Sequence, residues 1–309
     1  MLSISMAGLK LKQAFSQRPQ WDFRACTTGR LAIQNLPMEP GIPAHNFEVV
    51  SKELVALAAS IDGYLTDPEV RFLTLLAAEP TARGEILEIG SFKGKSTIIL
   101  AKAMALVEQP RLVAVDPMPA PATAAPEAGV DKSTWSDFQA NLKRAGVHSA
   151  VEFHRMYSAE HAATWQRKIR LLWIDGNHTY ASAKLDFDKF SPHLTNGGIV
   201  ALHDLMRGFG GPDRVFLEDI LASPQFGAAG ICGSIGWAQF FADPQKTVPY
   251  RATKAKLATR LRHLIPYASQ NRNQRGLNRL KFRYRRALVP HAAPTPEAWA
   301  RQVVQCSNE

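Results

Sequence analysis

The residues best suited to chemistry follow two apolar runs of the sequence. The run RLLWI leads into Asp175, and His178 lies three positions further on. The run GIVAL leads into His203 and Asp204. In a doubly wound sheet the carboxyl ends of neighbouring parallel strands open onto one crevice, so we expect these side chains to converge there. Two carboxylates and an imidazole with open positions suit Mg²⁺, Mn²⁺ or a similar divalent ion.

Such a cluster could activate a hydroxyl group. An ion held by Asp175, His203 and Asp204 would bind a substrate hydroxyl and lower its pKa. His178 could then accept the proton as a general base. The structural alternative is that Asp175 caps the following turn, His203 fills a polar niche and His178 faces solvent. Residues 206–213, just beyond the cluster, contain three glycines and could close over it as a lid.

A second candidate site is a turn with two glycines after the apolar run ILEI. The turn reads Glu88-Ile-Gly90-Ser-Phe-Lys-Gly94-Lys-Ser96. Glycines at such a place let a ligand approach the backbone, and a helix that starts there points N–H groups at it. A triphosphate-binding loop needs one more residue before its Gly-Lys pair, and Phe92 stands where a dinucleotide fingerprint requires glycine. Both of these ligands therefore fit poorly.

The acidic residues around this turn favour a cofactor with a positive charge. A carboxylate at Glu88 would repel a pyrophosphate but can pair with an ammonium group, and the amino acid end of S-adenosylmethionine has one. Asp116 ends the next apolar run, where an acid accepts hydrogen bonds from both hydroxyls of a ribose. In the alternative interpretation the glycines only form a tight turn and Asp116 caps the next segment, since fold does not fix function.

The elements that must position these groups are short apolar runs alternating with helical stretches, a pattern typical of a parallel sheet covered on both faces. The predicted strands are 86–90, 111–116, 151–154, 170–175 and 198–203. The predicted helices between them span about 96–107, 132–145, 159–167 and 180–190. After a helix near 213–222, the runs 229–234 and 235–241 leave no room for a helix between them and must pair antiparallel. The sequence predicts a doubly wound, Rossmann-like α/β fold with a parallel core, helices on both faces and a C-terminal antiparallel strand pair.

The chain divides into three predicted parts. Residues 1–45 contain several prolines and read as an N-terminal arm. Residues 46–245 form the α/β domain with a helical lead-in. Its first helix is expected to begin at Asn46 as N-cap, and its second after Thr66, with Pro68 just inside. Residues 246–309 form a basic C-terminal extension.

Three stretches together resemble class I S-adenosylmethionine-dependent methyltransferases. They are ILEIGSFKGKST, the acid of VAVDP, and LLWIDGNHTYASAKLDFDKFSPHLTNGGIVALHD. Within that family the chain is most similar to the small-molecule O-methyltransferases that include catechol O-methyltransferase and the macrocin-type sugar methyltransferases. The resemblance covers roughly residues 62–242.

The resemblance implies roles for individual residues. The methionine end of the cofactor would be lined by Glu88, Gly90, Ser91, Gly94 and Ser96. Asp116 would hold the ribose, and Ser158 would lie near the adenine. The metal-ligand positions of the family match Asp175, His203 and Asp204, and His178 falls where the catechol enzymes place a basic lysine.

Two residues depart from the family pattern. Metal-binding relatives usually offer a carboxylate where His203 stands, which puts the ion in doubt. The sugar enzymes carry an acidic base where Asn177 stands, and asparagine cannot accept a proton. His178 is therefore the nearby candidate for the catalytic base, acting with Asp175.

Composition indicates a globular protein with an unusual charge distribution. The chain has 309 residues, 46% hydrophobic and 21% charged, with a net charge of +10. Residues 246–309 hold 14 Lys or Arg but two acidic residues, and the segment 251–286 holds 12 basic residues and no acidic one. The widely spaced Cys26, Cys232 and Cys306 give neither a metal-ligand spacing nor an even disulfide set, so we expect a reducing, cytoplasmic environment.

The basic extension has several possible uses. It could dock on an anionic membrane surface, bind a nucleic acid backbone, or recruit an acidic substrate. It could also be a solvated helix that packs one apolar face on the body, with a face made of Leu257, Leu261, Leu264 and Ile265.

These patterns lead to one main functional prediction. We expect S-adenosylmethionine-dependent methyl transfer to a hydroxyl of a small molecule, such as a sugar or secondary metabolite, with or without help from Mg²⁺ or another divalent cation. The protein would be cytoplasmic, and peripheral to a membrane if the extension docks there. The alternatives are an RNA methyltransferase guided by the extension, and a non-catalytic binding module for a membrane surface or nucleic acid.

Overall fold

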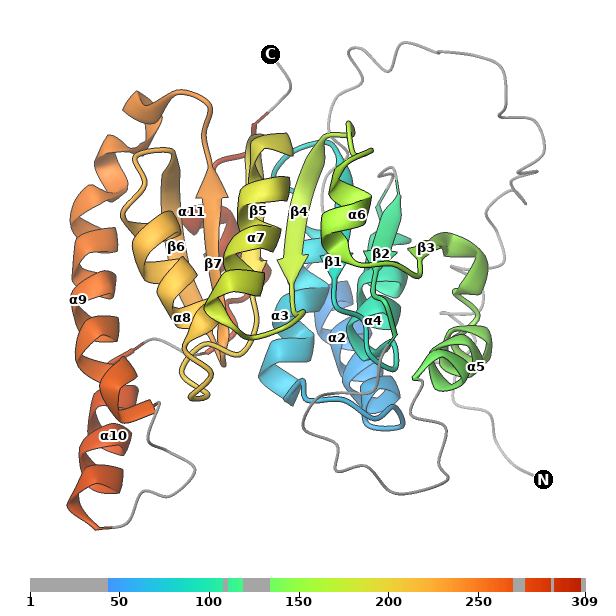
Figure 1. The fold of residues 1–309 in the computed structure, drawn as a ribbon, viewed down its shortest axis with the longest axis horizontal. Helices are drawn as coiled ribbons and strands as arrows, with labels where there is room; N and C mark the ends of the chain where they lie inside the picture. Colours follow the sequence, from blue (N-terminus) through green and yellow to red (C-terminus); the bar gives the residue numbers. More distant parts are fainter. Residues whose placement is uncertain (1–43, 108–110, 119–133, 269–275, 290–291, 307–309) are drawn as a thin grey trace. The chain divides into compact units, whose positions relative to one another are not determined.

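The computed structural model in Figure 1 describes residues 44–107, 111–118, 134–268, 276–289 and 292–306. The predicted arm of residues 1–45 lies outside the described residues apart from its last two positions, and so does Cys26.

A seven-stranded sheet of order β3-β2-β1-β4-β5-β7-β6 forms the centre of the domain (Figure 1). Its strands are β1 (Glu85–Ile89), β2 (Leu112–Val115), β3 (Val151–His154), β4 (Ile169–Ile174), β5 (Leu194–Leu202), β6 (Phe226–Cys232) and β7 (Ile235–Phe240). Strands β1 to β5 run parallel, whereas β7 pairs antiparallel with both β5 and β6. The predicted fold is confirmed. Strand order reverses between β1 and β4, which places the switch point, where ligands bind in such sheets, at their carboxyl ends.

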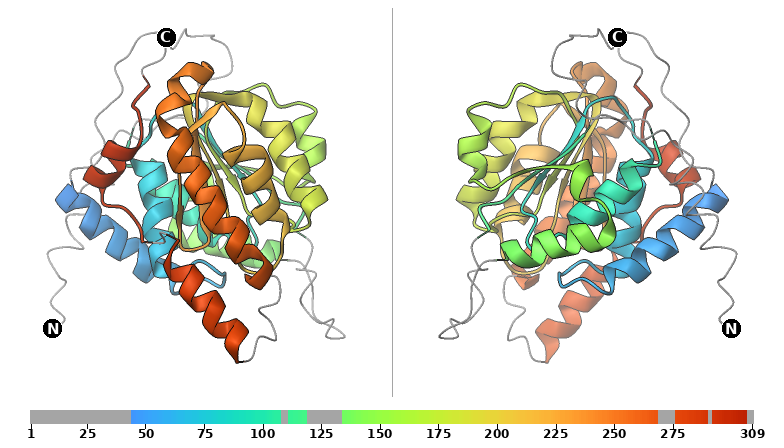
Figure 2. Two further views of the ribbon diagram at one scale, coloured as in Figure 1. Left: turned by 90° about the vertical axis from the view of Figure 1, so that its left-hand side faces the viewer. Right: turned by 90° about the vertical axis from the view of Figure 1, so that its right-hand side faces the viewer.

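Helices cover both faces of the sheet (Figures 1 and 2). They are α2 (Ala44–Ala58), α3 (Asp67–Ala78), α4 (Lys95–Met104), α5 (Trp135–Ala145), α6 (Ser158–Ala162), α7 (Tyr180–Phe190), α8 (Gly211–Val215), the π-helix η4 (Phe216–Leu221), α9 (Arg251–Ala268), α10 (Leu277–Ala287) and α11 (Pro296–Gln302). Short 3₁₀ turns are η2 (His148–Ala150), η3 (Ser191–His193) and η5 (Pro244–Tyr250).

Successive residues of each central strand enter different layers of the core, because side chains alternate across a sheet. Ile86 and Leu171 pack with α2 to α5 and α11 on one face. Leu87 and Leu172 pack with α7, η4 and α9 on the other. All four side chains are fully buried. This explains why the strands read as continuous apolar runs, as buried parallel strands do.

The lead-in helices begin differently from each other. Helix α3 starts after Thr66, as predicted, and Thr66 forms a capping box with Glu69, whose carboxylate accepts hydrogen bonds from the Thr66 backbone N–H and hydroxyl. The prediction of Asn46 as the cap of α2 is wrong, since α2 already begins at Ala44 and Asn46 lies within its first turn. Short polar side chains occur inside first turns as well as at caps, so the residue type alone did not locate the helix start.

The C-terminal extension packs on the body. Helix α9 lies against β6 and η4 and buries Leu257, Leu261 and Leu264, three residues of the predicted apolar face. Trp299 of α11 is 1% exposed and its ring contacts those of Phe72 and Trp237 in the opposite core layer. Among the described residues, no helix is both long and apolar enough to cross a membrane.

Candidate active site

The two predicted sites share a wall at the switch point. Gly90 directly follows β1 and has a φ of 88°, and a Cβ there would lie 2.3 Å from the carbonyl oxygen of Asp175. The Asp175 N–H donates to Ile89 O at 2.8 Å, which holds the two strand ends together. Only glycine fits at position 90, because the turn packs closely against the backbone of Asp175.

Glu88 is buried beneath the glycine turn. Its Oε2 accepts hydrogen bonds from Ser91 Oγ at 3.0 Å and Thr97 Oγ1 at 2.5 Å. Its Oε1 is buried and has no hydrogen-bond partner among the described residues. Burial raises the pKa of the Glu88 carboxyl to about 7, although the nearby hydroxyls of Ser96, Thr97 and Ser91 lower it. An unsatisfied carboxylate oxygen at this place suits a cationic ligand group.

The remaining turn residues shape the start of α4. Gly94 is the N-cap with a φ of 87°, and a Cβ there would lie 2.8 Å from Leu142 Cδ1. Ser91 and Ser96 are buried beside it. The turn is thus pressed against α5 on one side, and its shape depends on both glycines.

Asp116 contacts the glycine turn directly. Its Oδ2 accepts the N–H groups of Ser91 at 2.7 Å and Phe92 at 2.9 Å, and its Oδ1 accepts that of Met118 at 2.7 Å. A carboxylate offers about four lone-pair sites. One of these sites is left open, whereas the sequence interpretation expected this carboxylate to accept hydrogen bonds from both hydroxyls of a ribose.

Ser158 begins α6 and donates to Asp186 Oδ1 of α7 at 2.5 Å. Burial raises the pKa of the Asp186 carboxyl to about 6, against the lowering effect of this hydrogen bond. Asp186 also lies near Gly176, whose added Cβ would be 3.4 Å from Asp186 Oδ2. Ser158 is thereby linked to the loop that follows Asp175.

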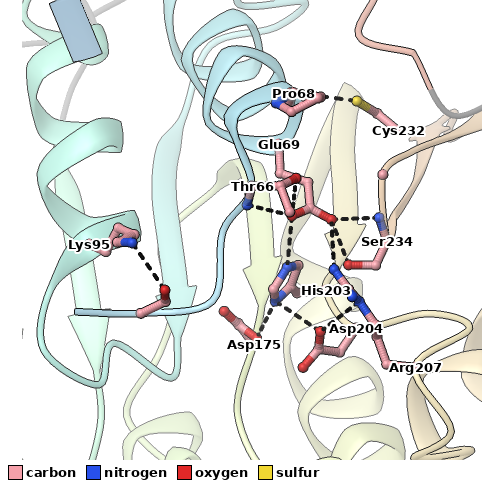
Figure 3. Close-up of polar contacts among 12 residues, drawn as sticks. Thr66, Pro68, Glu69, Lys95, Asp175, His203, Asp204, Arg207, Cys232 and Ser234 are labelled. Atoms are coloured by element: carbon pink, nitrogen blue, oxygen red, sulfur yellow. Dashed lines mark hydrogen bonds and ion pairs between the residues drawn. The ribbon is translucent and has the colours of Figure 1, made fainter. Parts of the chain in front are cut away.

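His203 lies at the centre of a group of carboxylates (Figure 3). The ring is 2% exposed, and its Nδ1 is 2.9 Å from Asp175 Oδ1 and 3.7 Å from Asp204 Oδ1. Its Nε2 is 3.8 Å from Glu69 Oε2. Burial would lower the pKa of His203, but Asp175, Glu69 and Asp204 together raise it well above its usual range. This ring is therefore a buried cation that balances its acidic neighbours.

Glu69 is the residue of this cluster that the sequence interpretation missed. It is fully buried, and its Oε1 accepts hydrogen bonds from the Ser234 N–H and hydroxyl, both at 2.6 Å (Figure 3). Burial would raise the pKa of the Glu69 carboxyl, but His203, Ser234 and Thr66 hold it far below its usual value. The T-x-x-E spacing after Thr66 could have indicated a capping role. It gave no sign that the side chain also meets β5.

His178 completes a second group of side chains on the open side of the cluster. Its Nε2 lies 3.2 Å from Asp204 Oδ2 and 3.7 Å from Asp175 Oδ1, without a hydrogen-bond partner in the described part of the chain. One ligand atom from each of Asp175, His178 and Asp204 falls within a 4.8 Å group. An unpartnered imidazole nitrogen beside two carboxylates fits a divalent ion. The structure thus brings His178, rather than His203, together with the two aspartates in that group.

The glycine-containing segment after β5 contacts the same residues. The Phe209 ring stacks on that of His178 at 4.4 Å, and an added Cβ at Gly211 would lie 2.3 Å from His178 O. Asp204 has a φ of 60°, a strained value for a non-glycine residue. Arg207 lies 3.9 Å from both Asp204 and Glu69 and is half exposed (Figure 3). This segment therefore forms one wall of the cluster.

Residues 87–205 match a family model described as a methyltransferase domain. This segment is a methyltransferase domain. The predicted resemblance to class I methyltransferases is confirmed, because the matched residues run from β1 to just beyond Asp204. They include the glycine turn together with Asp175, His178, His203 and Asp204.

Two of the solved structures that are similar to this chain come from bacteria. One is the O-methyltransferase from Bacillus cereus in complex with SAH, with 21% identity over 62% of this chain and 90% of that chain and a TM-score of 0.44. Another is the O-methyltransferase TomG from Streptomyces achromogenes, involved in tomaymycin synthesis, with 19% identity over 62% and 90% and a TM-score of 0.44.

Proposed function

We propose that the methyltransferase domain binds S-adenosylmethionine at the glycine turn and transfers its methyl group to a hydroxyl of a small molecule held beside Asp175, His178 and Asp204. The observation that carries this proposal is the shared wall between Gly90 and Asp175. It brings the glycine turn next to a group of potential base and ligand atoms.

The residues of the turn match the polar groups of this cofactor. The buried Oε1 of Glu88 has no partner among the described residues and would accept the ammonium group. The one open lone-pair site of Asp116 would accept a ribose hydroxyl. When bound, the cofactor supplies a methyl carbon activated by a sulfonium, and attack on it is an in-line displacement that depends mainly on positioning.

His178 is the proposed general base. Its Nε2 faces Asp204, whose carboxylate would stabilise the imidazolium that forms when the acceptor hydroxyl gives up its proton. The Phe209 ring covers one face of the imidazole and limits the directions from which water reaches it. His203, already a cation, cannot serve as the base and instead fixes the orientation of Asp175 through the 2.9 Å contact.

A divalent ion would be held by Asp175, His178 and Asp204, and it would supply Lewis-acid activation of the acceptor hydroxyl. One imidazole nitrogen cannot bind an ion and accept a proton at the same time. Metal binding and base catalysis by His178 are therefore alternatives that an experiment can separate. Calorimetric titration with Mg²⁺ or Mn²⁺ of wild type and Asp204→Asn reports binding without any activity assay.

The test of the proposed function combines cofactor binding with turnover. Calorimetry should show saturable binding of S-adenosylhomocysteine to wild type and weaker binding, by about tenfold or more, to Glu88→Gln. With an acceptor found by screening hydroxylated small molecules, His178→Ala should lower kcat by about 10²–10⁴-fold with cofactor affinity retained. Replacement of the exposed His148 by alanine is the matched control. Absence of saturable cofactor binding would overturn the proposal.

A further inference from the structure

Helix α10 carries an apolar face that the other described residues leave exposed. Leu277, Leu280, Tyr284 and Leu288 have exposed fractions of 74%, 64%, 69% and 49%. Their spacing of three and four residues places them on one side of the helix. These four large apolar side chains therefore form one exposed patch. Exposed apolar patches are typical of interaction sites.

The opposite side of α10 is fixed to the body. Phe282 is partly buried against the core layer that contains α9. Arg285 Nη1 donates to His263 O of α9 at 2.5 Å, and Arg286 Nη2 donates to Gly233 O at 2.5 Å. The exposed face therefore points away from the protein as a consequence of these contacts.

Cations occupy other sides of α10, with Lys281 and Arg283 nearer to the apolar face than Arg279. Arg279, Lys281 and Arg283 are all exposed, and α10 contains no acidic residue. Helix α9 differs, because its leucines are buried in the core, while the cations Arg251 and Arg262 are exposed at its surface. Of these two helices, α10 is therefore the one whose described residues present exposed leucines beside cations.

We propose that α10 docks the protein on an anionic lipid surface, with its leucines in the interfacial region and its cations on the headgroups. Short helices with an apolar face and flanking Lys or Arg bind membranes in this way. Charge complementarity decides for a lipid surface over a second copy of the chain, since two such faces would bring like charges together. A nucleic acid would engage the cations but would leave the exposed leucines without a role.

The docking helix reaches the edge of the sheet that carries the site. Gly233, the acceptor for Arg286, lies in the turn between β6 and β7, next to Ser234, which binds Glu69. That turn is beside the carboxyl end of β5, because Leu202 pairs with Gly236. A docked molecule would therefore hold the residues at the carboxyl end of β5 near the lipid headgroups. Docking itself does not depend on the proposed methyl transfer.

Vesicle flotation of the full chain tests the proposal without cofactor or acceptor. Wild type should float with phosphatidylcholine vesicles that contain phosphatidylglycerol and not with phosphatidylcholine alone, and salt should weaken binding. Leu277→Gln with Leu280→Gln should lower the partition coefficient about tenfold or more. Arg279→Gln, Lys281→Gln and Arg283→Gln together should lower it by a similar factor.

Matched controls separate α10 from general charge and hydrophobicity. Arg251→Gln, Lys256→Gln and Arg262→Gln remove the same number of charges from α9, and Val49→Gln with Leu185→Gln removes two exposed apolar groups from α2 and α7. Circular dichroism melting confirms that each variant is folded. The proposal is overturned if anionic vesicles are not bound or if the controls lose as much binding as the α10 variants. RNA retention without vesicle binding, or a dimer lost on changing the leucines, would also overturn it.

Discussion

Replacing Glu88 with glutamine should change how the stability of the cofactor-free protein depends on pH. The carboxyl pKa is about 7 in the folded protein and 4.5 for an unperturbed glutamate. Between these values the folded chain binds more protons than the unfolded chain, so the free energy of unfolding falls as pH rises. The Glu88 carboxyl therefore contributes most to the free energy of unfolding below pH 4.5. Once pH exceeds 7, its ionisation has lowered that free energy by about 3 kcal/mol.

Glutamine has nearly the same shape and cannot ionise, so Glu88→Gln should escape this loss. From pH 5 to pH 8 the wild type should lose about 2–3 kcal/mol relative to the variant. For a domain of this size that corresponds to a shift in the difference between their melting temperatures of roughly 5–10 °C, in favour of the variant. Burial also raises the pKa of Asp186 and of Asp213 to about 6, but both proteins share these groups and the comparison cancels them.

Thermal unfolding followed by circular dichroism at several pH values is the assay. The control is Glu160→Gln, which removes an exposed carboxylate from α6. Melting curves of wild type and Glu88→Gln that shift in parallel between pH 5 and pH 8 would refute the reasoning. Such a result would mean that the buried Oε1 finds a partner in the cofactor-free protein.

Three further substitutions test other parts of the structure by urea denaturation. Gly90→Ala should lower the free energy of unfolding by about 2–4 kcal/mol, because its Cβ would lie 2.3 Å from Asp175 O at a positive φ; an unchanged midpoint would contradict the shared wall. Leu261→Ala should cost about 2–5 kcal/mol, since this α9 side chain is 1% exposed; a neutral result would mean that α9 does not pack on the body. Glu69→Gln should lower the free energy of unfolding by about 2 kcal/mol or more, because it weakens the hydrogen bonds that Glu69 accepts from Ser234; equal stability would remove Glu69 as a structural link between α3 and the turn between β6 and β7.

The sequence predicted the sheet well because buried parallel strands leave an unmistakable apolar pattern. The predicted strand 151–154 coincides with β3, and the others differ from the observed strands by a few residues at their ends. Helix 159–167 was predicted too long, since α6 ends at Ala162. Trp165 then turns into the core and its indole N–H donates to Arg167 O, a local contact that no periodicity indicates.

The convergence of the site was predictable, whereas its internal arrangement was not. Parallel strand ends had to bring Asp175 and Asp204 together, and they do. Which imidazole is accessible depends on side-chain packing. Here His203 is buried beside Glu69 of α3, and His178 lies beside both aspartates. A contact between α3 and β5 has no local signature in the chain.

The packing of Trp299 against Phe72 and Trp237 has a practical consequence for truncated forms of this protein. A chain shortened before α9 would lose an indole from the middle of one hydrophobic layer and uncover the outer strand β6. Its loss of vesicle or nucleic acid binding would then report unfolding as readily as it would report a missing contact surface. Functions of the last sixty or so residues are better dissected by changing side chains that already face water.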